Sequence, residues 1–89
     1  MTCYKISEDV DLQPLDNSLI VLLLSKNSYY ELNESARFYF EHLSAGEDEA
    51  SIVRVAKARY RGVSTERLQA DLQAVVHELV SLGVLSQKS

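Results

Sequence analysis

The sequence predicts an α+β domain in which a three-stranded antiparallel β-meander is followed by a bundle of three helices. The strands are indicated by an unbroken apolar run of six residues, Leu19 to Leu24, with two shorter strand-like segments on either side. The helices are indicated by apolar residues that recur three or four positions apart through the rest of the chain. Strands followed by helices, without repeats or linkers, are typical of this class. With 89 residues, the chain is expected to form one domain, residues 1–89.

The expected strands cover about residues 3–14, 19–25 and 28–32. The middle strand is apolar on both faces, so we expect it to lie at the centre of the sheet. Pro14 ends or kinks the first strand, because proline cannot donate to a β-ladder. Asn27, in the turn before the third strand, is suited to a left-handed backbone conformation.

The expected helices cover about residues 34–44, 48–61 and 64–82. Each follows a side chain that caps helix N-termini well, namely Asn33, Asp48 and Ser64. After the last helix, Val84 and Leu85 are expected to fold back onto it, and residues 87–89 to form a polar tail. The apolar stripes comprise Ala36, Tyr39, Phe40 and Leu43; then Ile52, Val55, Ala56 and Tyr60, with Val53 beside them; and then Leu68, Leu72, Val75, Leu79 and Leu82, widened by Val76 and Val80.

The third strand is predicted to be the functional surface. A short strand at the end of a sheet leaves one row of backbone N–H and C=O groups unpaired. A partner peptide can use such an edge by adding a strand to it. Side chains alternate along a strand, so Tyr30 should point inward with Leu32, and Tyr29 and Glu31 should point the other way. Tyr29 is then either a contact for a peptide or an ordinary strand aromatic.

No motif in the sequence indicates catalysis, a metal site or a cofactor. His42 and His77 lie on different expected helices, and the single cysteine, Cys3, has no partner for a disulfide or a metal site. The three glycines lie at expected helix ends, so no phosphate-binding loop is present. No apolar run reaches membrane-spanning length, and the first residues do not resemble a signal peptide. We therefore expect a non-catalytic, cytoplasmic protein with no membrane partner.

Charge is distributed unevenly along the chain. Residues 1–53 carry ten acidic and three basic side chains, whereas residues 54–89 carry three acidic and six basic ones, for a net charge of −4. This pattern indicates either a solvated helix face or a patch for an acidic partner or a phosphate backbone. The basic cluster consists of Arg54, Lys57, Arg59, Arg61 and Arg67.

Two segments carry a resemblance to a known family. One is Tyr29-Tyr30-Glu31-Leu32-Asn33-Glu34-Ser35-Ala36 with a helix closing before Gly46, and the other is Glu78-Leu79, three residues, then Gly83-Val84-Leu85. In both, the sequence resembles the PqqD-like family, the leader-recognition elements of ribosomally made, post-translationally modified peptides. The resemblance covers about Val10 to Leu85. The chain length and the helix beginning at Arg67-Leu68-Gln69-Ala70-Asp71-Leu72 look most like the free-standing recognition proteins of lasso-peptide clusters.

The resemblance implies a winged-helix-like bundle and a specific mode of binding. The leader segment of a precursor peptide would add as a fourth strand beside residues 28–32, in a groove walled by the third helix. A separate maturation enzyme, such as a leader protease, would then receive the precursor. Leu68, Leu72 and Val75 are alternatively plain core residues, and Arg67 and Asp71 could hold opposite charges of a leader. The implied peptide-binding residues are Ser28, Tyr29, Tyr30, Glu31, Leu32, Arg67, Leu68, Asp71, Leu72 and Val75.

Two other functions fit parts of the pattern. A winged-helix nucleic-acid-binding regulator would use the basic cluster at residues 54–67 to contact phosphates. A pI near 5.0 and a third helix with one basic residue, Arg67, argue against it, so nucleic acid is not expected as a partner. A dimerisation module in which two copies pair through their 28–32 strands is the third possibility.

Overall fold

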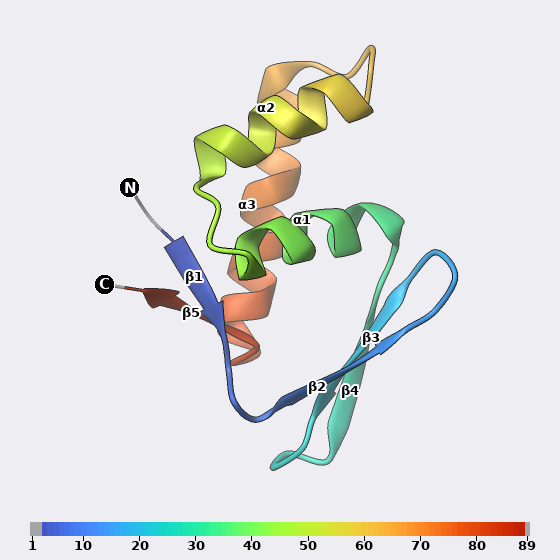
Figure 1. The fold of residues 1–89 in the computed structure, drawn as a ribbon, viewed down its shortest axis with the longest axis vertical. Coiled ribbons are helices and arrows are strands. Elements are labelled where there is room, and N and C mark those ends of the chain that lie inside the picture. Colours follow the sequence, from blue (N-terminus) through green and yellow to red (C-terminus); the bar gives the residue numbers. More distant parts are fainter. Residues whose placement is uncertain (1–2, 89) are drawn as a thin grey trace.

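The computed structural model of the protein describes residues 3–88 and confirms the α+β class (Figure 1). A three-stranded sheet precedes three helices, and a second, two-stranded sheet joins the two ends of the described chain. The elements are β1 (Cys3–Ile6), β2 (Val10–Pro14), β3 (Leu19–Leu23), β4 (Ser28–Leu32), α1 (Glu34–Ser44), α2 (Glu49–Arg59), α3 (Thr65–Ser81) and β5 (Leu85–Lys88).

The three-stranded sheet has the antiparallel order β2-β3-β4, so the apolar run lies at its centre as predicted. Leu19, Val21 and Leu23 are buried, whereas Ile20 and Leu22, on the opposite face, are half-buried. The turn between β3 and β4 contains Asn27 in the left-handed conformation, with φ of 51°. The sheet therefore packs its β3 side chains into the core through one face.

The expected first strand is in fact two strands that belong to different sheets, so the prediction of one strand over residues 3–14 is wrong. The chain breaks at residues 7–9, where the Ser7 N–H donates to the carbonyl of Val84 (2.9 Å) and the Asp9 N–H donates to Ser7 Oγ (3.2 Å). Such local side-chain bonds favour a turn over a continuing strand. β1 then pairs with β5 instead of β3, with Ile6 opposite Leu85.

The expected polar tail is also corrected by this pairing. Gln87 and Lys88 belong to β5, with Gln87 opposite Tyr4, while Ser89 lies outside the described residues. Leu85 is buried, and Val84 is buried and donates its N–H to the carbonyl of Leu79 at 2.9 Å. The prediction that this segment folds back onto α3 is confirmed. Strand β5, which begins at Leu85, was not predicted.

All three predicted N-caps are present. Asn33 Oδ1 accepts from the N–H of Ala36 (2.9 Å), Asp48 Oδ1 from that of Ser51 (2.8 Å) and Ser64 Oγ from that of Arg67 (3.2 Å). Two bonds from Ser51, first from its backbone and then from its side chain, lower the pKa of Asp48. α2 ends at Arg59, two residues earlier than expected, because Tyr60 has left helical geometry with φ of −109° and ψ of 76°.

Two valines expected in apolar stripes point outward. Val55 on α2 is 41% exposed and Val80 on α3 is 42% exposed. The buried stripe of α2 consists of Ile52, Val53 and Ala56, which places Val55 on the opposite side of the helix. Val53 therefore fills the core position that the sequence assigned to Val55.

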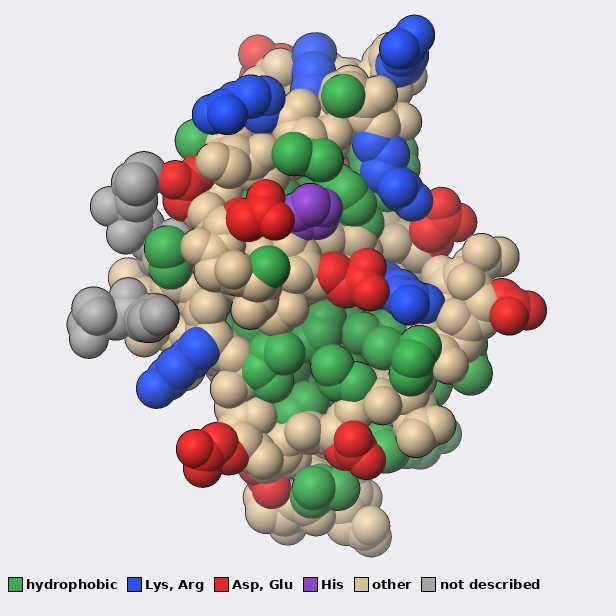
Figure 2. Space-filling view, in the orientation of Figure 1, with side chains coloured by type: hydrophobic (Ala, Val, Ile, Leu, Met, Phe, Trp, Pro, Cys, Tyr) green, Lys and Arg blue, Asp and Glu red, His purple; other side chains and the backbone are tan. Residues whose placement is uncertain are grey.

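The elements stack from one end of the molecule to the other in Figure 1. The β2-β3-β4 sheet forms one end, α1 lies between that sheet and α2, and α3 runs behind both helices. β1 and β5 lie together at the side where the two termini emerge. Apolar surface is visible between α1 and the sheet (Figure 2). Val10 and Leu12 of β2 are half-buried and pack against the core.

Replacement of the first cap tests how firmly β4 is joined to α1. Asn33→Ala removes the acceptor for the Ala36 N–H, and we expect a loss of about 1 kcal/mol in the free energy of unfolding. Asn33→Asp keeps an acceptor and should retain most of the stability. Urea denaturation followed by circular dichroism measures both variants. Equal stability of Asn33→Ala and the wild type would contradict the role assigned to this cap.

Candidate functional site: the β4 edge beside α3

β4 is the last strand of its sheet and is paired on one side only, by β3. Its side chains alternate as predicted: Tyr30 is half-buried and Leu32 buried, whereas Glu31 is exposed and Tyr29 is 69% exposed. In an antiparallel pair, alternate residues turn their N–H and C=O groups away from the neighbouring strand. β4 therefore presents backbone donors and acceptors along its outer edge.

The opposite edge of the same sheet, on β2, is blocked by its own residues. The N–H of Leu12 donates to Oδ1 of Asp11 at 3.0 Å, which occupies a donor of that strand. Pro14, at the end of β2, has no N–H to offer. An acidic side chain and a proline are common means of protecting an edge strand. Of the two edges of this sheet, β4 is the one suited to accept another strand.

Asp71, Val75 and Leu82 lie on one flank of α3, and Val75 and Leu82 pack partly against the core. The other flank, with Gln73 and Val76, lines hollows shared with α2, β1 and β5. The β3–β4 turn is tied to the end of α3, because Lys26 Nζ donates to the carbonyl of Leu82 at 3.3 Å.

Both β4 and the α3 segment carry half-buried apolar side chains. Tyr30 on β4 and Val75 and Leu82 on α3 all pack partly against the core while keeping some exposed surface. Such side chains provide apolar contact area at the surface without disturbing the core. We group β4 with Asp71, Val75 and Leu82 as the candidate binding surface and use the name β4–α3 cleft for it.

The remaining expected α3 residues differ in burial and in their partners. Leu68 and Leu72 are 2% and 1% exposed, so they belong to the core and offer no surface to a peptide. Arg67 and Asp71 pair with each other, with 3.5 Å between Arg67 Nε and Asp71 Oδ1. Asp71 also lies close to Tyr39, whose pKa is raised first by burial and then by the charge of Asp71 and by Tyr60.

Leu82 of the cleft, and Lys26, which bonds to its carbonyl, were not among the expected site residues. The sequence pattern could have identified Leu82, because it belongs to the same apolar stripe as Val75 and lies two helical turns beyond it. No sequence pattern points to Lys26, because its partner is a backbone carbonyl 56 residues later in the chain. A side chain that bonds to the main chain of a distant segment leaves no pattern in the sequence.

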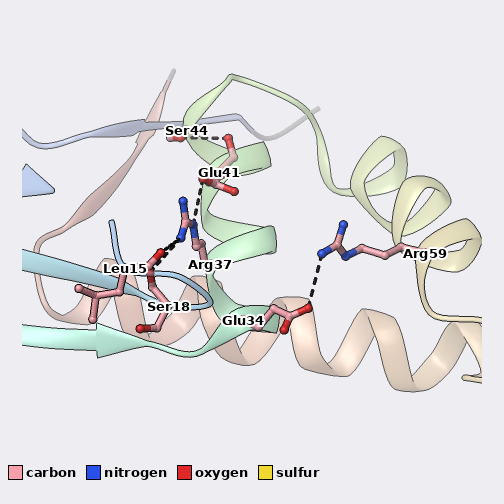
Figure 3. Close-up of polar contacts among 7 residues, drawn as sticks. All are labelled: Leu15, Ser18, Glu34, Arg37, Glu41, Ser44 and Arg59. Atoms are coloured by element: carbon pink, nitrogen blue, oxygen red, sulfur yellow. Dashed lines mark hydrogen bonds and ion pairs between the residues drawn. The ribbon is translucent and has the colours of Figure 1, made fainter. Parts of the chain in front are cut away.

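Polar contacts hold both ends of the β-meander. At the β2–β3 turn, an Arg37 guanidinium nitrogen donates to the carbonyls of Leu15 and Ser18, both at 2.9 Å, while Arg37 Nε pairs with Glu41 at 3.2 Å (Figure 3). At the other end, Asp9 accepts bonds from the N–H and hydroxyl of Ser25, at 2.9 and 2.6 Å. β4 is thereby fixed relative to α1 before any partner binds.

The described residues give little sign of other chemistry. Among residues 3–88, no three His, Cys, Asp or Glu side chains come together in a way that could hold a metal ion. His42 is paired with Glu47 at 2.6 Å, and His77 is exposed. The helices of this described part are all too short or too polar to span a membrane.

A three-stranded antiparallel sheet followed by three helices is the fold on which comparison with known families bears. The family model described as "Coenzyme PQQ synthesis protein D (PqqD)" matches residues 19–85, which run from β3 to the first residue of β5. The chain therefore belongs to the PqqD family. A search of the curated proteins finds no match.

Two solved structures share this fold over nearly the whole chain. One, described as "TbiB1 in Complex with the TbiA(beta) Leader Peptide", has a TM-score of 0.85 and 24% identity and covers 96% of this chain and 98% of its own. The other, described as "Lasso peptide synthetase B1 complexed with the leader peptide", has a TM-score of 0.86 and 19% identity and covers 93% of this chain and 96% of its own. At these identities the likeness establishes the fold.

Removal of the Lys26 contact should loosen one end of the cleft. Lys26→Met loses a hydrogen bond and a positive charge at the C-terminus of α3, at a cost of about 0.5–1 kcal/mol. We expect faster amide hydrogen exchange in residues 24–28, and little change in β1. Lys5→Met, which removes another exposed lysine, is the matched control. Identical exchange in residues 24–28 of both variants would show that the contact does not hold the turn.

Proposed function

We propose that the protein captures the leader segment of a ribosomally made precursor peptide by β-strand addition to β4. It then presents the precursor to a separate maturation enzyme, such as a leader protease, and performs no catalysis itself. We place this activity in the cytoplasm. The observation that carries the proposal is the unblocked edge of β4 beside a half-buried apolar flank of α3.

Strand addition divides recognition between backbone and side chains. Backbone hydrogen bonds along β4 supply affinity with little dependence on leader sequence. Because strand side chains alternate, every second leader residue would point into the β4–α3 cleft, towards Tyr30, Val75 and Leu82. Those contacts favour apolar leader residues at alternate positions. For an interface of this small size we expect a dissociation constant of roughly micromolar to nanomolar.

Arg67 and Asp71, in the first half of α3, would modify this preference for apolar leader residues. Arg67 and Asp71 are paired at 3.5 Å, and their side chains are 73% and 48% exposed. An exposed pair of this kind stabilises the protein by about 1 kcal/mol or less, so either partner can be exchanged at little cost. A leader with an acidic and a basic residue at matching positions would take over both partners.

The comparisons support the proposal without deciding the binding residues. Both structural neighbours are described as complexes with a leader peptide, and both share the arrangement of sheet and helices found here. The family match covers β3, β4 and the three helices. The proposed position of the peptide at the β4–α3 cleft is supported by the blocked β2 edge and by the half-buried side chains of this chain.

Nucleic-acid binding by the basic cluster is not favoured by the positions of its members. Arg59 is paired with Glu34 at 3.6 Å (Figure 3). It also lies over the Phe38 ring, 5.1 Å from its centroid. Arg67, the basic residue of α3, is paired with Asp71. A recognition helix needs polar side chains free for base edges, and α3 uses much of its surface for core packing.

Two valine variants on α3 test the cleft. Val75→Asp places a carboxylate among half-buried apolar side chains of the cleft and should weaken leader binding about tenfold or more. Val80→Asp makes the same chemical change on the same helix at an exposed position outside the cleft, and binding should stay within about twofold of the wild type. Isothermal titration calorimetry with a synthetic leader of the precursor encoded beside this gene measures both.

Circular dichroism of the two variants checks that each is folded. Equal leader affinities for folded Val75→Asp and the wild type would remove α3 from the binding site. Self-association of the wild type through β4, seen as a dimer by sedimentation and abolished by added leader, would show that two copies compete for the same edge.

A further inference from the structure

We propose that the exposed side of α2 is a second docking surface, which binds an acidic patch with an adjoining apolar residue on the maturation enzyme. We call this surface the α2 face. The inference rests on the proposed leader-binding function, because it concerns the partner to which the precursor would be presented. The α2 face consists of Arg54, Val55, Lys57, Ala58 and Arg61.

Helical spacing brings three of these side chains to one side of α2. Arg54, Lys57 and Ala58 follow one another at positions i, i+3 and i+4, and Val55 lies at the edge of this group. All are exposed, whereas the buried stripe of Ile52, Val53 and Ala56 faces the core. Arg61 is also exposed and lies in the turn after α2, beyond the helical part of the face.

The charge of the face is available for a partner. Arg54 and Arg61 form no ion pair within residues 3–88, and Lys57 makes one bond, to the carbonyl of Val63 at 3.3 Å. Figure 2 shows Lys and Arg side chains gathered at the end of the molecule formed by α2 and its following turn. This is a positive end on a protein whose net charge is −4. Such an asymmetry orients an approaching acidic partner towards α2.

Val55 indicates that this partner is a protein. It is 41% exposed and lies with the exposed Ala58 at the edge of the basic group. Protein–protein contacts combine apolar and polar side chains, with arginine among the residues enriched there. A phosphate backbone would use the arginines and the lysine but would gain nothing from a valine. The chemistry therefore fits a protein surface with Asp or Glu side chains beside an apolar residue.

The position of α2 allows both partners to bind at once. α2 and the β2-β3-β4 sheet lie at opposite ends of the molecule in Figure 1, with α1 between them. A leader on β4 would leave the α2 face uncovered. Holding enzyme and precursor on one small domain raises the effective concentration of one for the other. The domain would act as an adaptor with two separate binding surfaces.

Direct binding measurements with the purified maturation enzyme encoded beside this gene test the inference. The double variant Arg54→Glu/Lys57→Glu should lower the affinity for the enzyme about tenfold or more, mainly through slower association. Val55→Ser should weaken it several-fold through faster dissociation. Lys5→Glu, a reversal on exposed β1, is the matched control and should have little effect. Leader affinity, measured in parallel, should be the same in all variants.

The outcomes separate the two proposals. Unchanged enzyme affinity in the double variant, or no enzyme binding by the wild type, would overturn the α2 face. Binding of a short DNA duplex that is lost in the double variant but unaffected by Val55→Ser would overturn it in favour of a phosphate-binding surface. Enzyme binding that needs the α2 face in a protein that binds no leader would support the docking surface while contradicting the proposed function.

Discussion

The direct junction between β4 and α1 is the constraint on which the rest of the structure depends. Leu32 is buried at the end of β4, Asn33 caps the next helix, and α1 begins at Glu34, so no loop separates sheet from bundle. A strand joined in this way cannot move independently of the helix that follows it. The sheet is then held at its ends by the hydrogen bonds of Arg37 and Asp9.

A fixed strand with a free edge has a specific physical consequence. Its unpaired backbone groups are already arranged for pairing, so an incoming peptide loses conformational entropy while the protein loses little. The two edges of the sheet differ in this respect: β2 satisfies the Leu12 N–H with Asp11 and ends in proline, whereas β4 contains no proline and carries the half-buried Tyr30. The difference directs a ligand strand to one edge and suppresses pairing at the other.

Local patterns accounted for most of the fold and for one half of the candidate site. The central apolar strand, the three capping residues and the alternation of Tyr29 and Tyr30 depend on neighbours in sequence, and all are found. Two features depend on segments distant in sequence, namely the pairing of β1 with β5 and the Lys26 contact with Leu82. The outward position of Val55 depends on which of two valines in α2, Val53 or Val55, faces the core. Helical spacing grouped Leu68, Leu72 and Val75 together, but burial separates the first two, in the core, from the third, which is part of the cleft.

The central claim is that a leader peptide binds as a strand along β4, and an amide NMR titration of the labelled protein tests it most directly. The ligand is a synthetic leader of the precursor encoded beside this gene. The account predicts chemical-shift changes centred on residues 28–32 and on the α3 flank from 71 to 82, and slower exchange of alternate β4 amides once the peptide is bound. Saturating binding that perturbs other residues and leaves 28–32 unchanged, or the absence of any binding, would contradict it.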